Sequence, residues 1–317
     1  MRRSLIIWSV IFGVFVAAFI GTVIALNATL FSAGGFVRVY LDSLARGDVD
    51  GALALPGVAV PEGVSDELLD PDALAVLSDI RQIEDTDLGD GTHQVTVEYA
   101  IGPSAGRSTF LVQDAGSVFG VFSGWRFAES PLATIQATVL HDDRFTANGV
   151  PLRTESVLPV AVFTPGWYVF DHESAFLAAE ATAVAATVPG EQLATTLDVQ
   201  ADTAFVEQVQ EELTSYLDDC ATQRVLMPSG CPFGQEIDNR IESEPVWSLT
   251  AYPQATITPG AERGTWQMPP SAGAARLTVD VRSIFDGTLS TFDEDVPFTV
   301  QYLITFQADG SLLITAQ

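Results

Sequence analysis

The hydrophobic pattern of the chain begins with an uninterrupted apolar segment, Leu5–Leu26, which contains no charged residue. A helix of this length is roughly 33 Å long, enough to cross a hydrocarbon layer of about 30 Å. Arg2 and Arg3 precede the segment, and basic residues favour the cytoplasmic side of a membrane. We therefore predict a cytoplasmic stub over residues 1–4, a transmembrane anchor over residues 5–30 and an extracytoplasmic C-terminal part.

A cleaved signal peptide is the alternative interpretation of this segment. Signal peptides have apolar cores of about 7–15 residues that end at a site with small residues. The segment here is longer, and residues 25–31 offer no such site, so the pattern favours a retained anchor. Residues 31–35, which include Gly34 and Gly35, then predict a short flexible linker.

The next part of the chain changes from a helical period to strict alternation. Residues 36–46, 48–55 and 66–80 each place their apolar side chains on one helical face. Between residues 94 and 127 apolar and polar positions alternate, which predicts strands. Helices followed by an antiparallel sheet predict an α+β domain over residues 36–129.

Two further domains follow in the predicted organisation. Residues 130–200 consist of short apolar strands, with Asn148–Gly149 as a two-residue hairpin signal, and predict a small β-sandwich. Residues 201–317 begin with a helical face and continue as strands, with Asp309–Gly310 as the last hairpin turn. The predicted fold class is therefore α+β: a transmembrane helix, a helix-plus-curved-sheet domain, a small all-β domain and a second helix-plus-antiparallel-sheet domain.

Three resemblances to known protein families add expectations about the fold and function of these domains. The segment Phe36–Leu55, with its Gly47–Asp48 break, resembles the opening helices of NTF2-like domains, which wrap a curved antiparallel sheet around a helical hairpin. The Asn148–Gly149 turn, followed by Pro165–Val169, is similar to PEGA-type and related Ig-like modules of bacterial envelope proteins. One membrane helix followed by such modules resembles the ectodomains of TcaA-type membrane proteins, which implies a role in the cell envelope.

The charge of the chain narrows the choice of partners. The formal net charge is −27 although only 17% of the residues are charged, because cations are few. A chain with no basic stripe disfavours nucleic acid and anionic lipid surfaces as partners. The acidity serves solubility, or it attracts cations or a basic partner.

Both cysteines, Cys220 and Cys231, fall in the part predicted to lie outside the membrane. An oxidising compartment and an even number of cysteines favour a disulfide between them. The spacing does not match a redox C-x-x-C motif, and no neighbouring histidine or further cysteine completes a tetrahedral zinc site. We predict a structural disulfide that contributes about 2–3 kcal/mol.

The three histidines of the chain do not form a recognisable site. His93 follows a turn signal and is expected to be solvated. His141 precedes two aspartates, but a metal site there would need a third side chain from elsewhere in the fold. His172 stands between Asp171 and Glu173, and adjacent residues on a strand point to opposite faces, so no acid–base pair is expected.

Two other patterns were considered as candidate sites. Asp85–Gly91 resembles a calcium loop, but its glycine is one place late and Thr96 falls where a bidentate glutamate belongs, which favours a solvated hairpin loop. In NTF2-like enzymes an Asp, Tyr or His lies inside the cone of the sheet. Tyr40, Asp42 and Tyr99 are the residues that could do so here, and the two tyrosines are more simply core aromatics.

The sequence therefore predicts no catalytic residue, no metal ligand and no cofactor. We predict a non-enzymatic protein that binds, senses or scaffolds in the bacterial envelope, with the membrane and an envelope protein or cell-wall component as partners. The alternative is an NTF2-like protein with a small-molecule pocket, with or without catalysis. A concave pocket lined by converging Asp, Tyr or His would favour the alternative, and filled cones would favour the first function.

Overall fold

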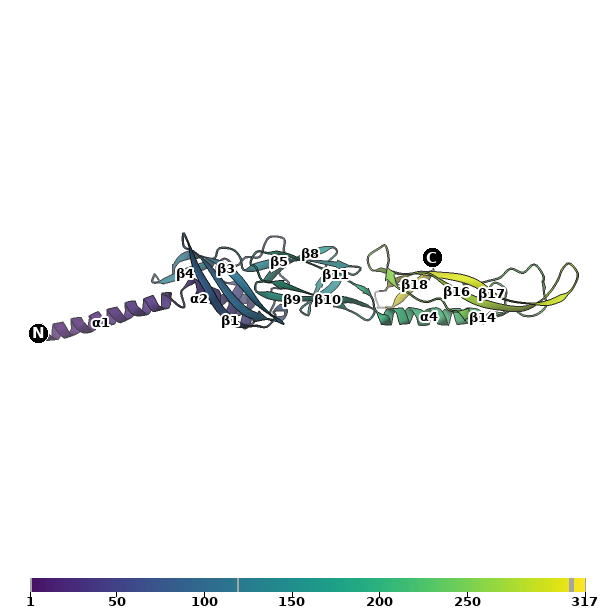
Figure 1. Cartoon of the computed structure of the whole chain (residues 1–317), viewed down its shortest axis with the longest axis horizontal. Coiled ribbons are helices and arrows are strands. Elements are labelled where there is room, and N and C mark those ends of the chain that lie inside the picture. Colours follow the sequence, from purple (N-terminus) through teal and green to yellow (C-terminus); the bar gives the residue numbers. More distant parts are fainter. Residues whose placement is uncertain (1, 119, 308–310, 317) are drawn as a thin grey trace. The chain divides into compact units, whose positions relative to one another are not determined.

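The computed structural model describes residues 2–118, 120–307 and 311–316, and for residues 2–6, 9, 10 and 118 it describes the backbone alone. The structure confirms the α+β class, with several antiparallel sheets (Figure 1). The chain divides into two compact units. Unit 1 comprises the chain up to Val139 together with Arg144–Asp171 and Ala181–Leu197, and unit 2 comprises Leu140–Asp143, His172–Glu180 and the chain from Asp198 onward.

The first helix, α1, spans Arg2–Asn27 and contains the predicted anchor segment. Its described side chains are almost all apolar, and most of them are exposed. Among the residues with described side chains, which leave out residues 2–6, 9, 10 and 118, the structure has no helix that meets the length and hydropathy of a membrane span. The side chains of Arg2 and Arg3 lie outside the described set, so the topology that they predict stays a prediction.

The glycine pair after α1 was expected to form a flexible linker, and this expectation is wrong. Helix α2 spans Ala33–Ala45, and the Ser32 hydroxyl caps it by accepting the amide of Gly35 at 3.0 Å. A Cβ at Gly35 would collide with the carbonyl oxygens of Thr29 and Leu30. The glycines therefore permit close packing between the end of α1 and the start of α2.

The helix expected over residues 66–80 is also wrong. Only Pro71–Ala73 is helical there, as the short 3₁₀ turn η1, and strand β1 runs from Leu77 to Gly89. The leucines of this segment fit a helical period, but β1 forms a ladder with β2 in which Leu77 lies opposite Ile101. Pairing with the next strand leaves no trace in the local period of the segment and has outweighed that period here.

A four-stranded antiparallel sheet curls around α2 in the order β1-β2-β3-β4. The predicted helical turn after Gly47 is α3, Val49–Leu53, which Asp48 caps. As predicted, Val95, Val97 and Tyr99 are buried on the inner face of β2. The remaining strands of this sheet are β2 (Thr92–Ile101), β3 (Ser104–Val118) and β4 (Phe122–Phe127).

The rest of unit 1 is all-β, as predicted for this part of the chain. One sheet contains β5 (Leu132–Leu140), β8 (Val157–Phe163) and β11 (Gln192–Asp198). The other contains β6 (Arg144–Ala147), β7 (Val150–Arg153), β9 (Gly166–Glu173) and β10 (Leu177–Ala186). Asn148–Gly149 forms the expected hairpin turn, with positive φ at both residues, and joins β6 to β7.

Unit 2 packs helix α4, Thr203–Ala221, against an antiparallel sheet. The sheet is built on two 18-residue strands, β16 (Thr265–Arg282) and β17 (Leu289–Phe306). The expected turn Asp309–Gly310 lies outside the described residues. The shorter strands of this sheet are β13 (Arg240–Ile241), β14 (Val246–Ala251), β15 (Thr258–Pro259) and β18 (Leu312–Ala316). Strand β12 (Gln200–Ala201) pairs instead with the start of β10.

The predicted disulfide between Cys220 and Cys231 is confirmed. It joins the last turn of α4 to the loop that follows the helix. Because the sequence separation is 11 residues, the bond closes a short loop in the unfolded chain. It therefore holds this loop against the end of α4.

Candidate functional site

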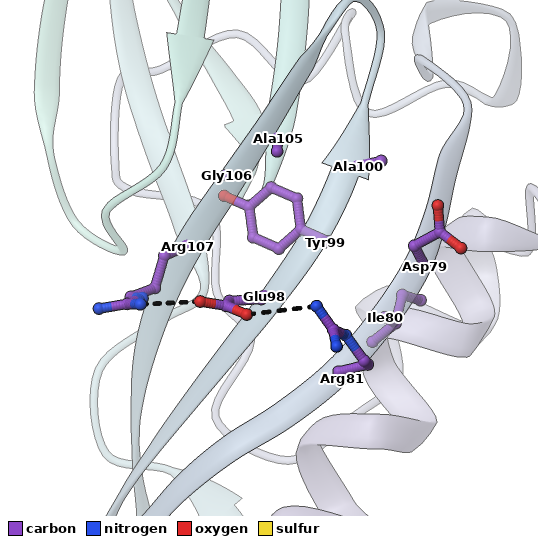
Figure 2. A pocket seen from close by; sticks show the side chains of 9 residues that line it. All are labelled: Asp79, Ile80, Arg81, Glu98, Tyr99, Ala100, Ala105, Gly106 and Arg107. Atoms are coloured by element: carbon purple, nitrogen blue, oxygen red, sulfur yellow. Dashed lines mark hydrogen bonds and ion pairs between the residues drawn. The ribbon is translucent and has the colours of Figure 1, made fainter.

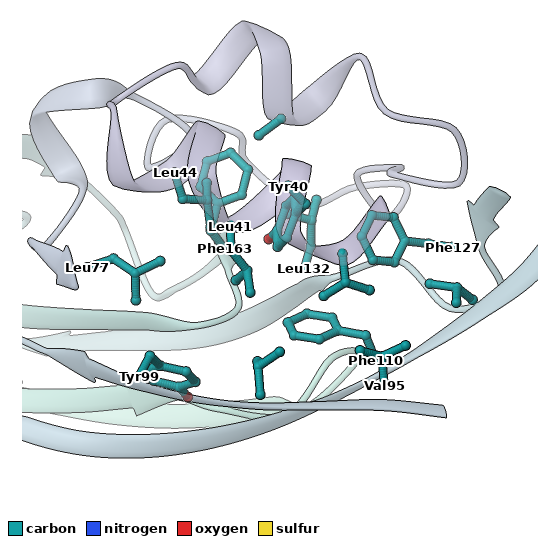
Figure 3. Packing of buried hydrophobic residues seen from close by; sticks show 14 of the residues in the cluster. Tyr40, Leu41, Leu44, Leu77, Val95, Tyr99, Phe110, Phe127, Leu132 and Phe163 are labelled. Carbon is teal, nitrogen blue, oxygen red and sulfur yellow. The ribbon is translucent and has the colours of Figure 1, made fainter. Parts of the chain in front are cut away.

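The inner face of the curled sheet, where NTF2-like enzymes place their chemistry, is filled by side chains. The apolar face of α2 packs onto it, with Tyr40 at the centre (Figure 3). The Tyr40 ring is fully buried and lies edge-on to Phe127 and Phe110, with ring centroids 5.3 and 5.9 Å apart. This region is a packed core.

The three residues considered for a site in this cone do not converge. The Tyr40 hydroxyl lies 3.0 Å from the carbonyl oxygen of Pro131 and 2.9 Å from that of Thr164, and burial raises its pKa well above the usual value. Tyr99 is bonded to the hydroxyl of Ser108 at 2.8 Å. Asp42 is on the outer side of α2, where its Oδ1 accepts from Arg38 Nε at 2.9 Å. Their arrangement supports structural roles.

An open hollow of about 1010 Å³ lies over strands β1, β2 and β3 of the same sheet. Glu98 stands between two arginines in it, as Figure 2 shows. Arg107 Nη2 donates to Glu98 Oε1 at 2.7 Å, and Arg81 Nη2 lies 3.5 Å from Oε2. The hydrogen bond from Arg107, with the charges of both arginines, lowers the pKa of Glu98.

The described side chains that line this hollow offer ionic interactions and no catalytic group. Two exposed guanidinium groups, of Arg81 and Arg107, share the hollow with the carboxylates of Glu98 and Asp79, so the formal charges of the lining cancel. Gly106 packs against the ring of Tyr99, where a Cβ would lie 2.6 Å from the ring. Tyr99 itself is buried, so the described lining contains no exposed nucleophile next to a base.

The histidines are dispersed over the fold. His93 Nδ1 lies 2.7 Å from Asp85 Oδ1, on the neighbouring strand β1, and the His93 ring meets that of Trp125 edge-on. Sequence reasoning missed this pair because it placed Asp85 in a loop. In unit 2, His141 Nδ1 lies 3.0 Å from Asp198 Oδ1. No group of three or more His, Cys, Asp or Glu residues that could hold a metal ion occurs among the described residues.

The end of α1 is joined to the sheet by a set of contacts that the sequence did not reveal. Asn27 Nδ2 donates to the carbonyl oxygen of Val121 at 3.0 Å, and Asn27 Oδ1 accepts the amide of Ser123 at 2.8 Å. The rings of Phe31 and Phe122 stack with centroids 4.3 Å apart. We call Asn27, Phe31 and the β3–β4 hairpin that they contact the α1 clasp. It connects the apolar helix directly to the first sheet.

The exposed groups described above lie on strands and on helices α1 and α2. The core of the first sheet is closed by packed side chains. The geometry is the sole basis for a functional conclusion. Comparisons with protein-family models, with curated proteins and with solved structures find no match to this chain.

Proposed function

We propose that this chain is a non-enzymatic, membrane-anchored protein whose extracytoplasmic part binds, senses or scaffolds in the bacterial cell envelope. The observation that carries the proposal is the surface of α1. Phe12 and Phe15 are each 71% exposed, and Phe19 and Ile24 are each 63% exposed. Burial of apolar surface is worth about 25 cal/mol per Å², so a lipid environment would stabilise this helix strongly.

The remaining architecture fits the envelope modules that the sequence resembles. A helical hairpin under a curled sheet supports an NTF2-like domain over residues 36–129, and the all-β part supports a PEGA- or Ig-like module over residues 130–200. Residues 201–317 then form a second α+β domain, in the manner of TcaA-type ectodomains. The disulfide supports an oxidising compartment for this last part.

The packed first core supports a role in binding over one in catalysis. Tyr40 and Tyr99 are bonded within the fold, and Asp42 faces outward, so none of these three side chains is placed to act as an acid, base or nucleophile in the cone of the first sheet. The alternative function, a small-molecule pocket, is favoured by one observation in unit 2. There a cavity between α4 and the sheet contains two tyrosines and a glutamate.

Deleting residues 2–26 should release the protein from the membrane, because the deletion removes the exposed apolar surface and retains Asn27. Alkaline carbonate extraction of membranes checks this: the full chain should stay in the pellet and the deletion variant should not. A single cysteine at Val76, which is 81% exposed, should react with an impermeant maleimide on intact cells. Extraction of the full chain, or labelling only after lysis, would contradict the anchor or its topology.

The binding role predicts that the chain contacts an envelope component in the cell. The chain contains no lysine, so we suggest a photoreactive amino acid in place of Phe285, a 96% exposed residue at the β16–β17 turn. We expect light-dependent capture of an envelope protein or cell-wall component there, above the level seen with the photoreactive group at the buried Trp266. No specific capture, combined with substrate turnover by the purified chain, would refute the non-enzymatic role.

A further inference from the structure

A cavity of about 300 Å³ lies in unit 2 between α4 and strands β17 and β18. Its volume is at the lower end of those that bind small molecules. It combines an apolar floor with two phenols and one carboxylate. The lining residues are Val209, Glu212, Leu213, Tyr216, Tyr302, Ile314 and Ala316.

The local structure explains why these side chains meet. Val209, Leu213 and Tyr216 follow one another at helical spacing on a single face of α4. On the sheet, Tyr302 lies directly opposite Ala316 in the antiparallel register, so both side chains are on the same face. Because Ala316 is small, it leaves space beside the phenol ring of Tyr302.

The polar groups of the cavity favour a positive charge. Glu212 Oε1 accepts one hydrogen bond, from Gln208 Nε2 at 2.9 Å, and the described lining contains no basic residue to neutralise the carboxylate. The Tyr216 hydroxyl donates to the carbonyl oxygen of Gly230. Burial raises the pKa of Tyr302, and the neighbouring Tyr216 raises it further, so both phenols are neutral at physiological pH.

We propose that this cavity binds an alkylammonium group, whether of a small organic amine or of a lysine side chain. Aromatic faces attract an ammonium group through their quadrupoles, and Glu212 supplies the opposite charge. The apolar side chains of Val209, Leu213 and Ile314 suit the methylene stem. The net charge of −27 raises the local concentration of cations and disfavours anionic ligands.

This proposal names a ligand class for the proposed binding role and therefore rests on that role. It does not depend on whether α1 lies in a membrane. The test is calorimetric titration of the full chain in detergent micelles with n-butylammonium, and with 1-butanol as the neutral counterpart. We expect binding of the ammonium and at least about tenfold weaker binding of the alcohol. Equal binding of both probes, or binding of neither, would overturn the proposal.

Matched variants test the residues. Glu212→Gln should weaken butylammonium binding about tenfold, whereas Glu211→Gln, the same change one position earlier and outside the lining, should leave it unchanged. Tyr302→Phe keeps the aromatic face and should change the affinity less than about threefold, whereas Tyr302→Leu should weaken it more. Equal effects of the two glutamate variants would overturn the assignment of Glu212. Circular dichroism checks that each variant is folded.

A peptide arm separates the two sources of the ammonium. A short peptide with one central lysine is compared with the same peptide carrying norleucine. If the lysine peptide binds more tightly than n-butylammonium, the natural ligand is a lysine side chain of a partner protein. If n-butylammonium binds more tightly, the natural ligand is a small amine. Both outcomes support the site. If neither the lysine peptide nor n-butylammonium binds, the proposed ammonium site is refuted. The membrane extraction test would still show separately whether α1 anchors the protein.

Discussion

Replacing Tyr40 by alanine is expected to lower the free energy of unfolding of unit 1 by about 3–5 kcal/mol, the usual cost of truncating a large buried aromatic residue. Tyr40 is fully buried between α2 and the sheet and packs against Phe110, Phe127 and Phe163. Its hydroxyl also reaches the carbonyl oxygens of Pro131 and Thr164. The truncation would therefore leave a cavity and remove a link between the first sheet and the segments beyond it.

Hydrogen exchange of the β2 amides in the full chain measures this effect in unit 1 separately from unit 2. Tyr40→Phe should cost less, about 1–3 kcal/mol, because it keeps the ring and removes only the hydroxyl from the two buried carbonyls. Val39→Ala is the matched control. Val39 is half exposed on the same helix, and its truncation should stay within about 0.5 kcal/mol. A Tyr40→Ala effect as small as that of Val39→Ala would show that this core is not closely packed.

Unit 1 should also lose stability steeply as the pH rises above about 10. Tyr40 and Tyr168 are buried, and desolvation raises the pKa of both phenols above their value in the unfolded chain. A group with a raised folded pKa contributes stability that is complete below the unfolded pKa and is lost as the pH rises through the folded pKa. Each of these phenols should remove about 1.4 kcal/mol per pH unit in this window. Tyr99, whose pKa burial also raises, should add to the slope in the same direction.

Denaturant unfolding between pH 9 and pH 11.5, followed by hydrogen exchange or by fluorescence, gives the slope. Tyr168→Phe should reduce this slope by roughly a third, because it removes one of three buried phenols, Tyr40, Tyr99 and Tyr168, whose pKa is raised by burial. It should also lower stability at pH 8, because the amide of Phe163 donates to the Tyr168 hydroxyl at 3.0 Å. A slope that Tyr168→Phe leaves unchanged would mean that other groups cause the alkaline transition.

Elements whose signals are local could be predicted from the sequence. The apolar face of α2 and the caps of α3 and α4 are set by residues within a few positions of each other, such as Asp48 and Asp202. The alternation in β2 likewise shows its buried face directly. The disulfide followed from the number of cysteines and the expected compartment.

Elements that depend on distant partners could not be predicted in this way. The start of strand β1 continues the helical spacing of the leucines before it, and only the ladder with β2 makes it a strand. The cavity in unit 2 shows the same limit, because the helical face with Tyr216 was visible but its meeting with Tyr302 was not. That meeting depends on the register between β17 and β18 and on the packing of α4.

The α1 clasp has a consequence for how a partner would be met. A flexible peptide tether would let the first sheet rotate freely relative to α1. Binding a partner would then cost the entropy of the orientations that are lost. Because Asn27 both donates to and accepts from the β3–β4 hairpin, the helix and the sheet are expected to tilt together. With α1 in a bilayer, a second protein anchored in the same plane would meet the sheet at a restricted angle and at a high effective concentration. If α1 is in a bilayer as proposed, the clasp would favour partners within the same membrane over partners that diffuse freely.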